Sequence, residues 1–170
     1  FSVAKRVRSE TAIGSGQVSI SSVAVDLARR IFGELDESIV LLVGAGDMAE
    51  AAARSLGNAA KTLRVVNRSF ERGAALAQTF GADVARWESL ENELVQADVV
   101  VASTGAKNFV VTRDMAKRVM KARRGRSLFF VDIAVPRNID PTIHTIDNIY
   151  VFNIDDLEEQ VAEGMKLREG

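Results

Sequence analysis

The feature that most constrains the fold of this chain is a glycine-rich turn placed directly after a short apolar run. Residues Ile39–Val43 are all apolar, and Gly44-Ala45-Gly46 follows them without a break. A strand buried on both faces has such a continuous run, whereas a strand with one exposed face alternates apolar and polar residues. Gly44 permits a tight turn, Gly46 lets another group approach the backbone, and the small Ala49 permits close packing of a helix. The pattern predicts a strand, a tight turn and a helix in immediate succession.

Strands and helices are expected to alternate along most of the chain. Short apolar runs predict strands at residues 39–43, 63–66, 82–85, 98–102, 128–133 and 149–152. Apolar residues at helical spacing predict helices at residues 20–31, 49–56, 74–80, 89–97 and 112–122, with a further helix after residue 153. This alternation is typical of a parallel sheet covered on both faces. We therefore expect an α/β fold, a doubly wound, mostly parallel Rossmann-type sheet with its ligand at the carboxyl ends of the strands.

The end of the second expected strand carries the next informative motif. Leu63–Val66 leads into Asn67-Arg68-Ser69, and Arg72 follows one helical turn later. Folds of this class that bind NAD place an acidic residue near here to hold the ribose hydroxyls, whereas this chain has arginines. A guanidinium group matches phosphate geometry and keeps its charge. The two motifs together predict an NADP(H) site with Arg68 and Arg72 near the 2′-phosphate; for Arg72, a solvated position on its helix is the alternative.

A third loop is expected at the same edge of the sheet. The run at residues 98–102 ends in Ser103-Thr104-Gly105. Because the carboxyl ends of parallel strands share one edge, this loop is expected to border the nicotinamide ribose. A strand-end turn without a ligand is the alternative.

Composition narrows the remaining classes of protein. The chain has 170 residues, of which 47% are hydrophobic, and this is enough for one sizeable core. Its net charge of -1 predicts no general attraction to nucleic acid or to acidic membranes. The absence of cysteine excludes disulfides, thiolate metal sites and a thiol nucleophile, and it fits a reducing, cytoplasmic location. Apolar runs are too short to span a membrane and no signal peptide opens the chain, so we expect no membrane partner and no metal.

Taken together, the motifs resemble those of the glutamyl-tRNA reductase family over essentially the whole chain. The most distinctive segment is Asp132-Ile133-Ala134-Val135-Pro136-Arg137-Asn138-Ile139-Asp140-Pro141, followed by Tyr150 and Ile154-Asp155-Asp156-Leu157. The motifs Gly44-Ala45-Gly46-Asp47-Met48 and Asn67-Arg68-Ser69 resemble the nucleotide motifs of the family. The segments Lys5–Thr11 and Val18–Ser22 resemble its linker and the start of the helix that follows. Asn138 departs from the family pattern, in which Asp is more usual.

The resemblance implies the NADPH-binding domain of an enzyme that reduces glutamyl-tRNA to glutamate-1-semialdehyde in tetrapyrrole (porphyrin) synthesis. In that family a cysteine of an N-terminal domain takes the glutamyl group from tRNA as a thioester, and NADPH delivers a hydride to it. Residues 1–17 are then a linker from that domain, residues 18–153 the NADP(H)-binding domain, and residues 154–170 the start of a helix toward a C-terminal dimerisation domain. Because this chain has no cysteine, we expect no catalytic residue in it. The chain alone is expected to bind NADPH without catalysing the reaction. The enzyme to which it belongs is expected to be a larger homodimer.

The resemblance also places Ala134, Val135 and Pro136 near the nicotinamide. A loop stiffened by Pro136 and Pro141 is the alternative for this segment. The full set of expected cofactor-binding residues is Gly44, Ala45, Gly46, Asp47, Met48, Asn67, Arg68, Ser69, Arg72, Ser103, Thr104, Gly105, Ala134, Val135 and Pro136.

Two other functions remain open at this point. A shikimate- or quinate-dehydrogenase-like NADP-binding domain shares the glycine turn and a similar Asn-Arg-Thr loop, although the segment Ile133–Pro141 favours the reductase. A non-catalytic NADP-responsive module would use the nucleotide for regulation or assembly instead.

Three further patterns have structural interpretations. A solvated helix face is the expectation for the basic run, with tRNA contact as the alternative: Lys117, Arg118, Lys121, Arg123, Arg124 and Arg126. His144 has no metal-ligand companion, so a surface or capping position is expected. Asp155 followed by Glu158 predicts a capping box for the last helix.

Overall fold

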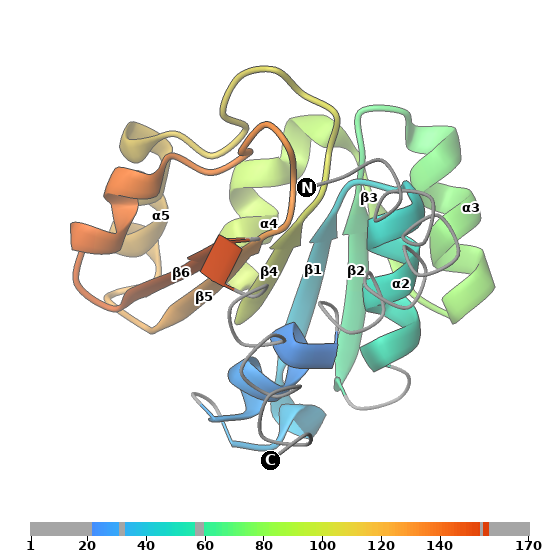
Figure 1. The fold of residues 1–170 in the computed structure, drawn as a ribbon, viewed down its shortest axis with the longest axis horizontal. Coiled ribbons are helices and arrows are strands. Elements are labelled where there is room, and N and C mark those ends of the chain that lie inside the picture. The colour runs from blue at the N-terminus through green and yellow to red at the C-terminus, as the bar shows by residue number, and fades with distance from the viewer. Residues whose placement is uncertain (1–21, 31–32, 57–59, 154, 157–170) are drawn as a thin grey trace, which may run out of the picture.

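The expected strands form one parallel sheet in the computed structural model, which describes residues 22–30, 33–56, 60–153 and 155–156. The sheet has six strands in the order β3-β2-β1-β4-β5-β6 (Figure 1). All neighbouring strands run parallel. The strands are β1 (Ile39–Val43), β2 (Thr62–Val66), β3 (Asp83–Ala85), β4 (Val99–Ala102), β5 (Leu128–Asp132) and β6 (Ile149–Asn153). The predicted doubly wound fold is confirmed.

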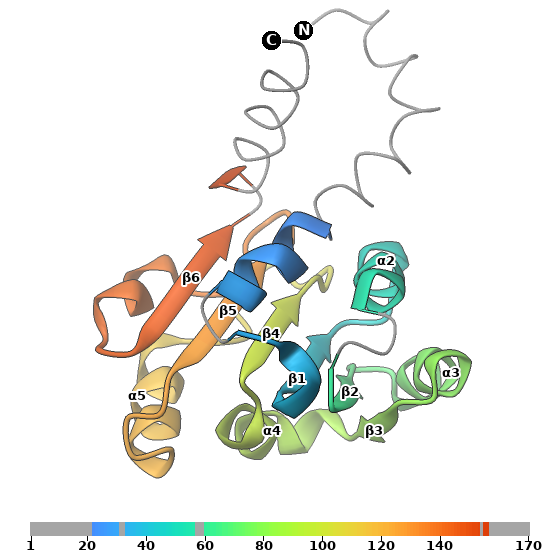
Figure 2. The same cartoon turned by 90° about the horizontal axis from the view of Figure 1, so that it is seen from below.

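Helices cover both faces of this sheet (Figure 2). Besides the helical residues 22–30, the α-helices are α2 (Asp47–Leu56), α3 (Phe70–Phe80), α4 (Leu90–Gln96) and α5 (Arg113–Ala122). The described residues also include three short 3-10 helices that the sequence did not predict: η1 (Leu35–Glu37), η2 (Trp87–Ser89) and η3 (Pro141–Thr145). Residues 22–30 pack on one face together with α2 and α3, and α4, α5 and η3 pack on the other.

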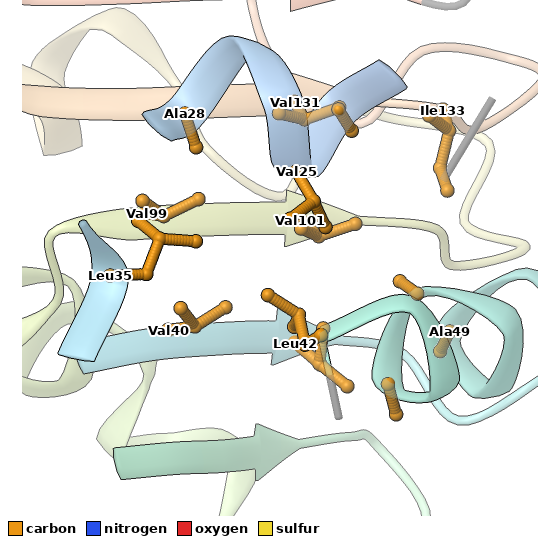
Figure 3. Close-up of a cluster of buried hydrophobic side chains, with 14 of the residues drawn as sticks. Val25, Ala28, Leu35, Val40, Leu42, Ala49, Val99, Val101, Val131 and Ile133 are labelled. Carbon is orange, nitrogen blue, oxygen red and sulfur yellow. The ribbon is translucent and has the colours of Figure 1, made fainter. Parts of the chain in front are cut away.

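The central strands explain why the sequence has continuous apolar runs. Successive side chains of a strand point to opposite faces. In β1, Val40 and Leu42 pack in the cluster beneath residues 22–30 and α2, which Figure 3 shows, while Leu41 and Val43 pack in the opposite cluster. All four are fully buried. A strand with apolar neighbours on both faces has no position for a polar residue, so the run stays unbroken.

Local chemistry sets the ends of the helices that flank the carboxyl edge of the sheet. Ser69 caps α3 by accepting a hydrogen bond from the backbone N–H of Arg72 at 3.3 Å, and Gly81 ends the helix with φ of +64°. Thr112 caps α5 by accepting from the N–H of Met115 at 3.3 Å. These caps orient the loops that precede α3 and α5.

The basic run extends from the middle of α5 to the turn before β5, at the opposite, amino edge of the sheet, and the expectation of a solvated face is wrong for Arg123. Its side chain is fully buried and donates to the carbonyl oxygens of Val95 at 2.8 Å, Ser127 at 2.5 Å and Ala97. Burial and, to a smaller extent, the nearby charge of Arg126 lower the pKa of Arg123 to about 10, while Asp98 opposes this shift. Arg123 therefore stays charged at neutral pH and ties the end of α4 to the start of β5.

The rest of the basic run is divided between paired and exposed groups. Arg118 pairs with Glu91 at 2.9 Å. Arg126 donates to the carbonyl of Val95 at 3.3 Å. Lys117, Lys121 and Arg124 are exposed, as expected.

The start of the last helix differs from the prediction. Asn153 and Asp156 cap it reciprocally: each side chain accepts a hydrogen bond from the backbone N–H of the other at 3.0 Å. Asp155 accepts instead from the Nη2 of Arg137 at 2.5 Å. Glu158, like residues 1–21 and 157–170 as a whole, lies outside the described residues.

Candidate functional site

A pocket opens where the chain order of the strands reverses. From β1 the chain winds outward through β2 and β3, then returns to place β4 on the other side of β1. Loops at such a point diverge and leave a crevice at the carboxyl edge of the sheet. The pocket there has a volume of about 480 Å³. It is lined by Ala45, Gly46, Asn67, Arg68, Ser69, Arg72, Ser103, Thr104, Gly105 and Ala106. Except for Ala106, these are all residues that the sequence predicted for the site.

The two glycines of the first loop serve different purposes. Gly44 is buried, has φ of +120° and donates its N–H to the carbonyl of Val66 at 2.9 Å. A Cβ on Gly44 would lie 2.9 Å from the backbone oxygen of Ser103, so only glycine lets the loops after β1 and β4 approach this closely. A Cβ on Gly46 would meet nothing within 4 Å. Gly46 therefore keeps open space at the mouth of the pocket, next to the start of α2.

The loop after β2 presents positive charge to the same pocket. The amide of Asn67 donates to the carbonyl of Ser69 at 3.0 Å and shapes this loop. Arg68 and Arg72 are exposed, and neither takes part in any ion pair found within the described residues. The guanidinium of Arg68 lies over the ring of Trp87, 5.1 Å from the ring centroid. The site thus has two arginine charges that no described carboxylate neutralises.

Gly73 supports this loop from α3, and the sequence did not predict this role. It lies in the first turns of α3, and a Cβ there would come within 3.3 Å of the Cβ of Asn67. Glycine at 73 therefore lets α3 pack closely on the loop that lines the pocket. A glycine inside a helical pattern is the signal that indicates such a close approach.

The loop after β4 supplies polar groups. The N–H of Ser103 donates to the carbonyl of Val43 at 2.9 Å and joins the loop to β1. The hydroxyl oxygen of Ser103 is buried and has no hydrogen-bond partner among the described residues. A buried polar group without a partner is uncommon, and at the wall of a pocket it indicates a place for a polar ligand group.

Two buried polar side chains hold this loop in place from the segment after β5. Asp132 accepts hydrogen bonds from the N–H groups of Ala134 at 3.2 Å, Asn138 at 2.9 Å and Ile139 at 2.8 Å. Burial raises the pKa of the Asp132 carboxyl, and these three hydrogen bonds oppose that rise. The segment from 132 to 139 is thereby folded around one carboxylate.

Asn138 then connects that segment to the pocket wall. Its side chain is fully buried, accepts from the N–H of Thr104 at 2.7 Å and donates to the carbonyl of Thr104 at 3.5 Å. The carbonyl of Asn138 accepts from the N–H of Val110 at 2.7 Å. An aspartate at this position could accept but not donate, so the amide fits the observed pairing. Asp132 and Asn138 both belong to the motif identified in the sequence, but the sequence did not predict that they support the pocket wall.

Other predicted site residues lie outside the pocket wall. Ala134 is buried, and Val135 and Pro136 are exposed at the end of β5, one strand beyond the pocket. Asp47 is exposed in the first turn of α2, and the side chain of Met48 packs against the core.

Neither a metal site nor a membrane span is found in the part of the chain that the structure describes. In that part no group of three or more His, Cys, Asp or Glu residues is placed to hold a metal ion. Nor does any helix there have the length and apolar character needed to cross a membrane. His144 is exposed, and its Nδ1 lies 2.7 Å from the carbonyl oxygen of Pro141.

Comparison with known proteins identifies relatives of the whole chain. The family described as Shikimate / quinate 5-dehydrogenase matches residues 26–160. The glutamyl-tRNA reductase of Sorangium cellulosum is 54% identical over 166 residues, which are 98% of this chain and 31% of that protein. The chain spans between 31% and 39% of the length of the most similar curated relatives.

Solved structures agree with this result. The glutamyl-tRNA reductase from Methanopyrus kandleri superposes with a TM-score of 0.84 at 37% identity, covering 97% of this chain and 42% of that one. The nucleotide binding domain of the reductase from Thermoplasma volcanium has a TM-score of 0.70 at 21% identity, covering 88% of this chain and 96% of that one, and it supports the fold alone. The resemblance drawn from the sequence motifs is confirmed. The chain therefore belongs to the family described as Shikimate / quinate 5-dehydrogenase and, within it, corresponds to the NADP-binding domain region of the glutamyl-tRNA reductases.

Proposed function

We propose that the pocket binds NADPH, and that Arg68 and Arg72 recognise its 2′-phosphate. The observation that carries the proposal is the pair of arginines on the pocket wall, without a carboxylate partner among the described residues. Phosphate would supply the missing negative charge, and guanidinium groups bind it with paired hydrogen bonds. An NAD site would instead need an acceptor for the ribose hydroxyls at this position.

The rest of the pocket fits the remaining parts of such a nucleotide. The pyrophosphate is assigned to the turn Gly44–Gly46, where the positive end of the α2 dipole and the N–H groups of the first turn of α2, which have no partner within the helix, favour an anion. The space that a side chain at Gly46 would fill is open. The hydroxyl of Ser103 needs a hydrogen-bond partner, and Ser103, Thr104 and Gly105 are assigned to the nicotinamide ribose. Asp47 and Met48 are assigned to the pyrophosphate turn through their backbone.

For Ala134, Val135 and Pro136 we propose a position near the nicotinamide in the longer protein. They follow β5, which neighbours β4 at the same edge of the sheet. They do not line the pocket, so a contact would need the nucleotide to extend beyond the wall formed by Ser103–Ala106.

We further propose that the longer protein reduces glutamyl-tRNA to glutamate-1-semialdehyde, and that this region supplies the reductant. The names of the relatives support this activity, and NADPH, when bound, supplies a hydride. Since the chain has no cysteine, a thioester-forming nucleophile must lie elsewhere in that protein. Residues 18–153 form the nucleotide domain in this proposal, and residues 1–17 and 154–170 lead to a catalytic and a dimerisation domain of a homodimer.

Calorimetric titration of the chain with NADPH and NADH tests the nucleotide assignment. We expect NADPH to bind more tightly, and Arg68→Ala to weaken NADPH binding about ten- to a hundredfold, as for loss of a charged hydrogen bond, while NADH binding is unchanged. Arg54→Ala, which removes an exposed arginine of α2 paired with Glu50, is the matched control and should leave both affinities unchanged. Equal binding of the two nucleotides to the unchanged chain would refute the 2′-phosphate assignment, and binding of neither would refute the site.

A further inference from the structure

We propose that Trp87 is a positioning residue for nucleotide selection, because its indole ring holds the Arg68 guanidinium at the pocket. This inference rests on the proposed NADPH site and adds to it the residue through which Arg68 is preorganised. Trp87 lies in η2, after β3, and is outside the pocket lining.

In the pair formed by Arg68 and Trp87, the indole ring is held by the core, whereas the arginine side chain is exposed. Trp87 is partly buried and packs against the core cluster that includes α4 and α5. Arg68 is exposed, and its Cζ lies 5.1 Å from the centroid of the Trp87 ring, within the range of a cation–π contact. A free arginine side chain samples many rotamers, and binding must restrict them. The contact with Trp87 restricts them before a ligand arrives.

A ring is better suited to this purpose than a carboxylate. Arg64, on the same strand-to-loop segment, is held by Glu93 at 2.5 Å and by Asp83 at 3.3 Å, so its charge is neutralised. The indole face attracts a cation through its quadrupole and carries no net charge. Arg68 is thus oriented while its full charge stays available for a phosphate group.

A second arginine–aromatic pair lies beside the first and supplies a matched control. Arg86 stacks over the ring of Phe70, 4.4 Å from its centroid. The β2–α3 loop with the first residue of α3 contributes Arg68 and Phe70, and the β3–α4 connection contributes Arg86 and Trp87. Of the four residues, Arg68 alone lines the pocket. The Arg86–Phe70 pair joins the same two segments without facing the ligand site.

The test compares two probes that differ in one phosphate, adenosine 2′,5′-bisphosphate and adenosine 5′-monophosphate, by calorimetry. We expect Trp87→Leu to weaken the bisphosphate about two- to fivefold, the size of an exposed cation–π contact, and to leave the monophosphate unchanged. Trp87→Phe retains a ring and should recover most of the affinity. In the Arg68→Ala background, Trp87→Leu should have no further effect. Arg86→Ala should leave both affinities unchanged.

Fluorescence gives an independent readout, because Trp87 is the one tryptophan of the chain. Without ligand, Arg68→Ala should change the emission of Trp87, and the bisphosphate should change it in the unsubstituted chain but not in Arg68→Ala. Since this measurement needs no substitution of Trp87, it holds even if Trp87→Leu fails to fold.

The outcomes separate this inference from the proposed function. If Arg68→Ala retains its affinity for the bisphosphate, the 2′-phosphate assignment itself is wrong. If Arg68→Ala loses that affinity but the losses from Trp87→Leu and Arg68→Ala add, or if Trp87→Leu weakens both probes equally, the NADPH site stands and the positioning by Trp87 is overturned.

Discussion

The two edges of the sheet use arginine in opposite ways. At the amino edge, Arg123 is fully buried, and its donors are satisfied by backbone carbonyls at the end of α4 and in the turn that precedes β5. At the carboxyl edge, Arg68 and Arg72 are exposed, line a pocket and have no ion-pair partner among the described residues. Arg123 therefore stabilises the fold, whereas Arg68 and Arg72 leave their charge available for a ligand.

The largest effect on stability is expected when the buried Arg123 is replaced. Arg123→Met removes the donors to the carbonyls of Val95, Ala97 and Ser127 and leaves the buried Ala97 carbonyl without this partner. We expect the free energy of unfolding to fall by about 3–5 kcal/mol, measured by denaturant titration. Arg124→Met, one residue along at an exposed position, is the control and should leave stability nearly unchanged. Similar losses for the two variants would contradict the structural importance of Arg123.

The next largest effect is expected at the carboxyl edge, where Gly44 is closely surrounded by protein atoms and Gly46 is not. Gly44→Ala would place a Cβ 2.9 Å from the Ser103 backbone oxygen, and φ of +120° disfavours any side chain. For Gly44→Ala we expect the free energy of unfolding to fall by about 2–4 kcal/mol, measured by denaturant titration, and NADPH binding to be lost. Gly46→Ala meets no protein atom within 4 Å, so thermal unfolding should change little while NADPH affinity falls. If Gly46→Ala bound NADPH normally, the nucleotide would not approach this turn.

A smaller effect is expected when Asn138, the buried residue that supports the pocket wall, is replaced. Asn138→Ala removes the acceptor for the Thr104 N–H and leaves that group unpaired. We expect stability to fall by about 1–3 kcal/mol and the affinities for NADPH and NADH to fall together, because the loop 103–105 faces parts that the two nucleotides share. Denaturation and calorimetry measure the two losses. A loss confined to NADPH would argue against this position for the loop.

The smallest effect is expected from the exposed pair of Arg118 and Glu91. The hydrogen bond from Arg118 lowers the pKa of Glu91, and a lowered carboxyl pKa adds stability above the unfolded pKa that is lost as the pH falls through the folded pKa. Both side chains are exposed, so Arg118→Ala should leave the unfolding midpoint at pH 7 unchanged. NMR titration should show the pKa of Glu91 returning upward. A clear loss of stability would mean that the basic face is more than solvated charge.

Local patterns were sufficient for the framework of the site. The apolar run before Gly44 and the loop Asn67–Ser69 predicted which strands end at the pocket, because strand hydrophobicity and turn chemistry depend on near neighbours in the chain. Nine of the ten lining residues are among those predicted, and the tenth, Ala106, directly follows Gly105. The assignment of these residues to NADPH stays a prediction.

Contacts between distant segments were not predicted. Asn138 holds Thr104 across 34 positions of sequence, and Arg123 caps the end of α4 from 28 positions away at Val95. A run of basic residues has the same pattern whether one member turns inward or all face water. The interior position of Arg123 depends on carbonyl groups that only the packing of α4 beside α5 brings together.

Short-range patterns in the amino-acid sequence account for the alternation of strands and helices, for the glycine turn and for the arginines at the position where an NAD site would have an acid. These features follow from short-range periodicity and side-chain chemistry. The tertiary structure decided which arginine is buried, which is held by Glu93 and which is held by the ring of Trp87 with its charge unneutralised. The physical reason is that the partners of a charged side chain come from whichever segments the sheet order places beside it, and that order appears only when the chain is folded.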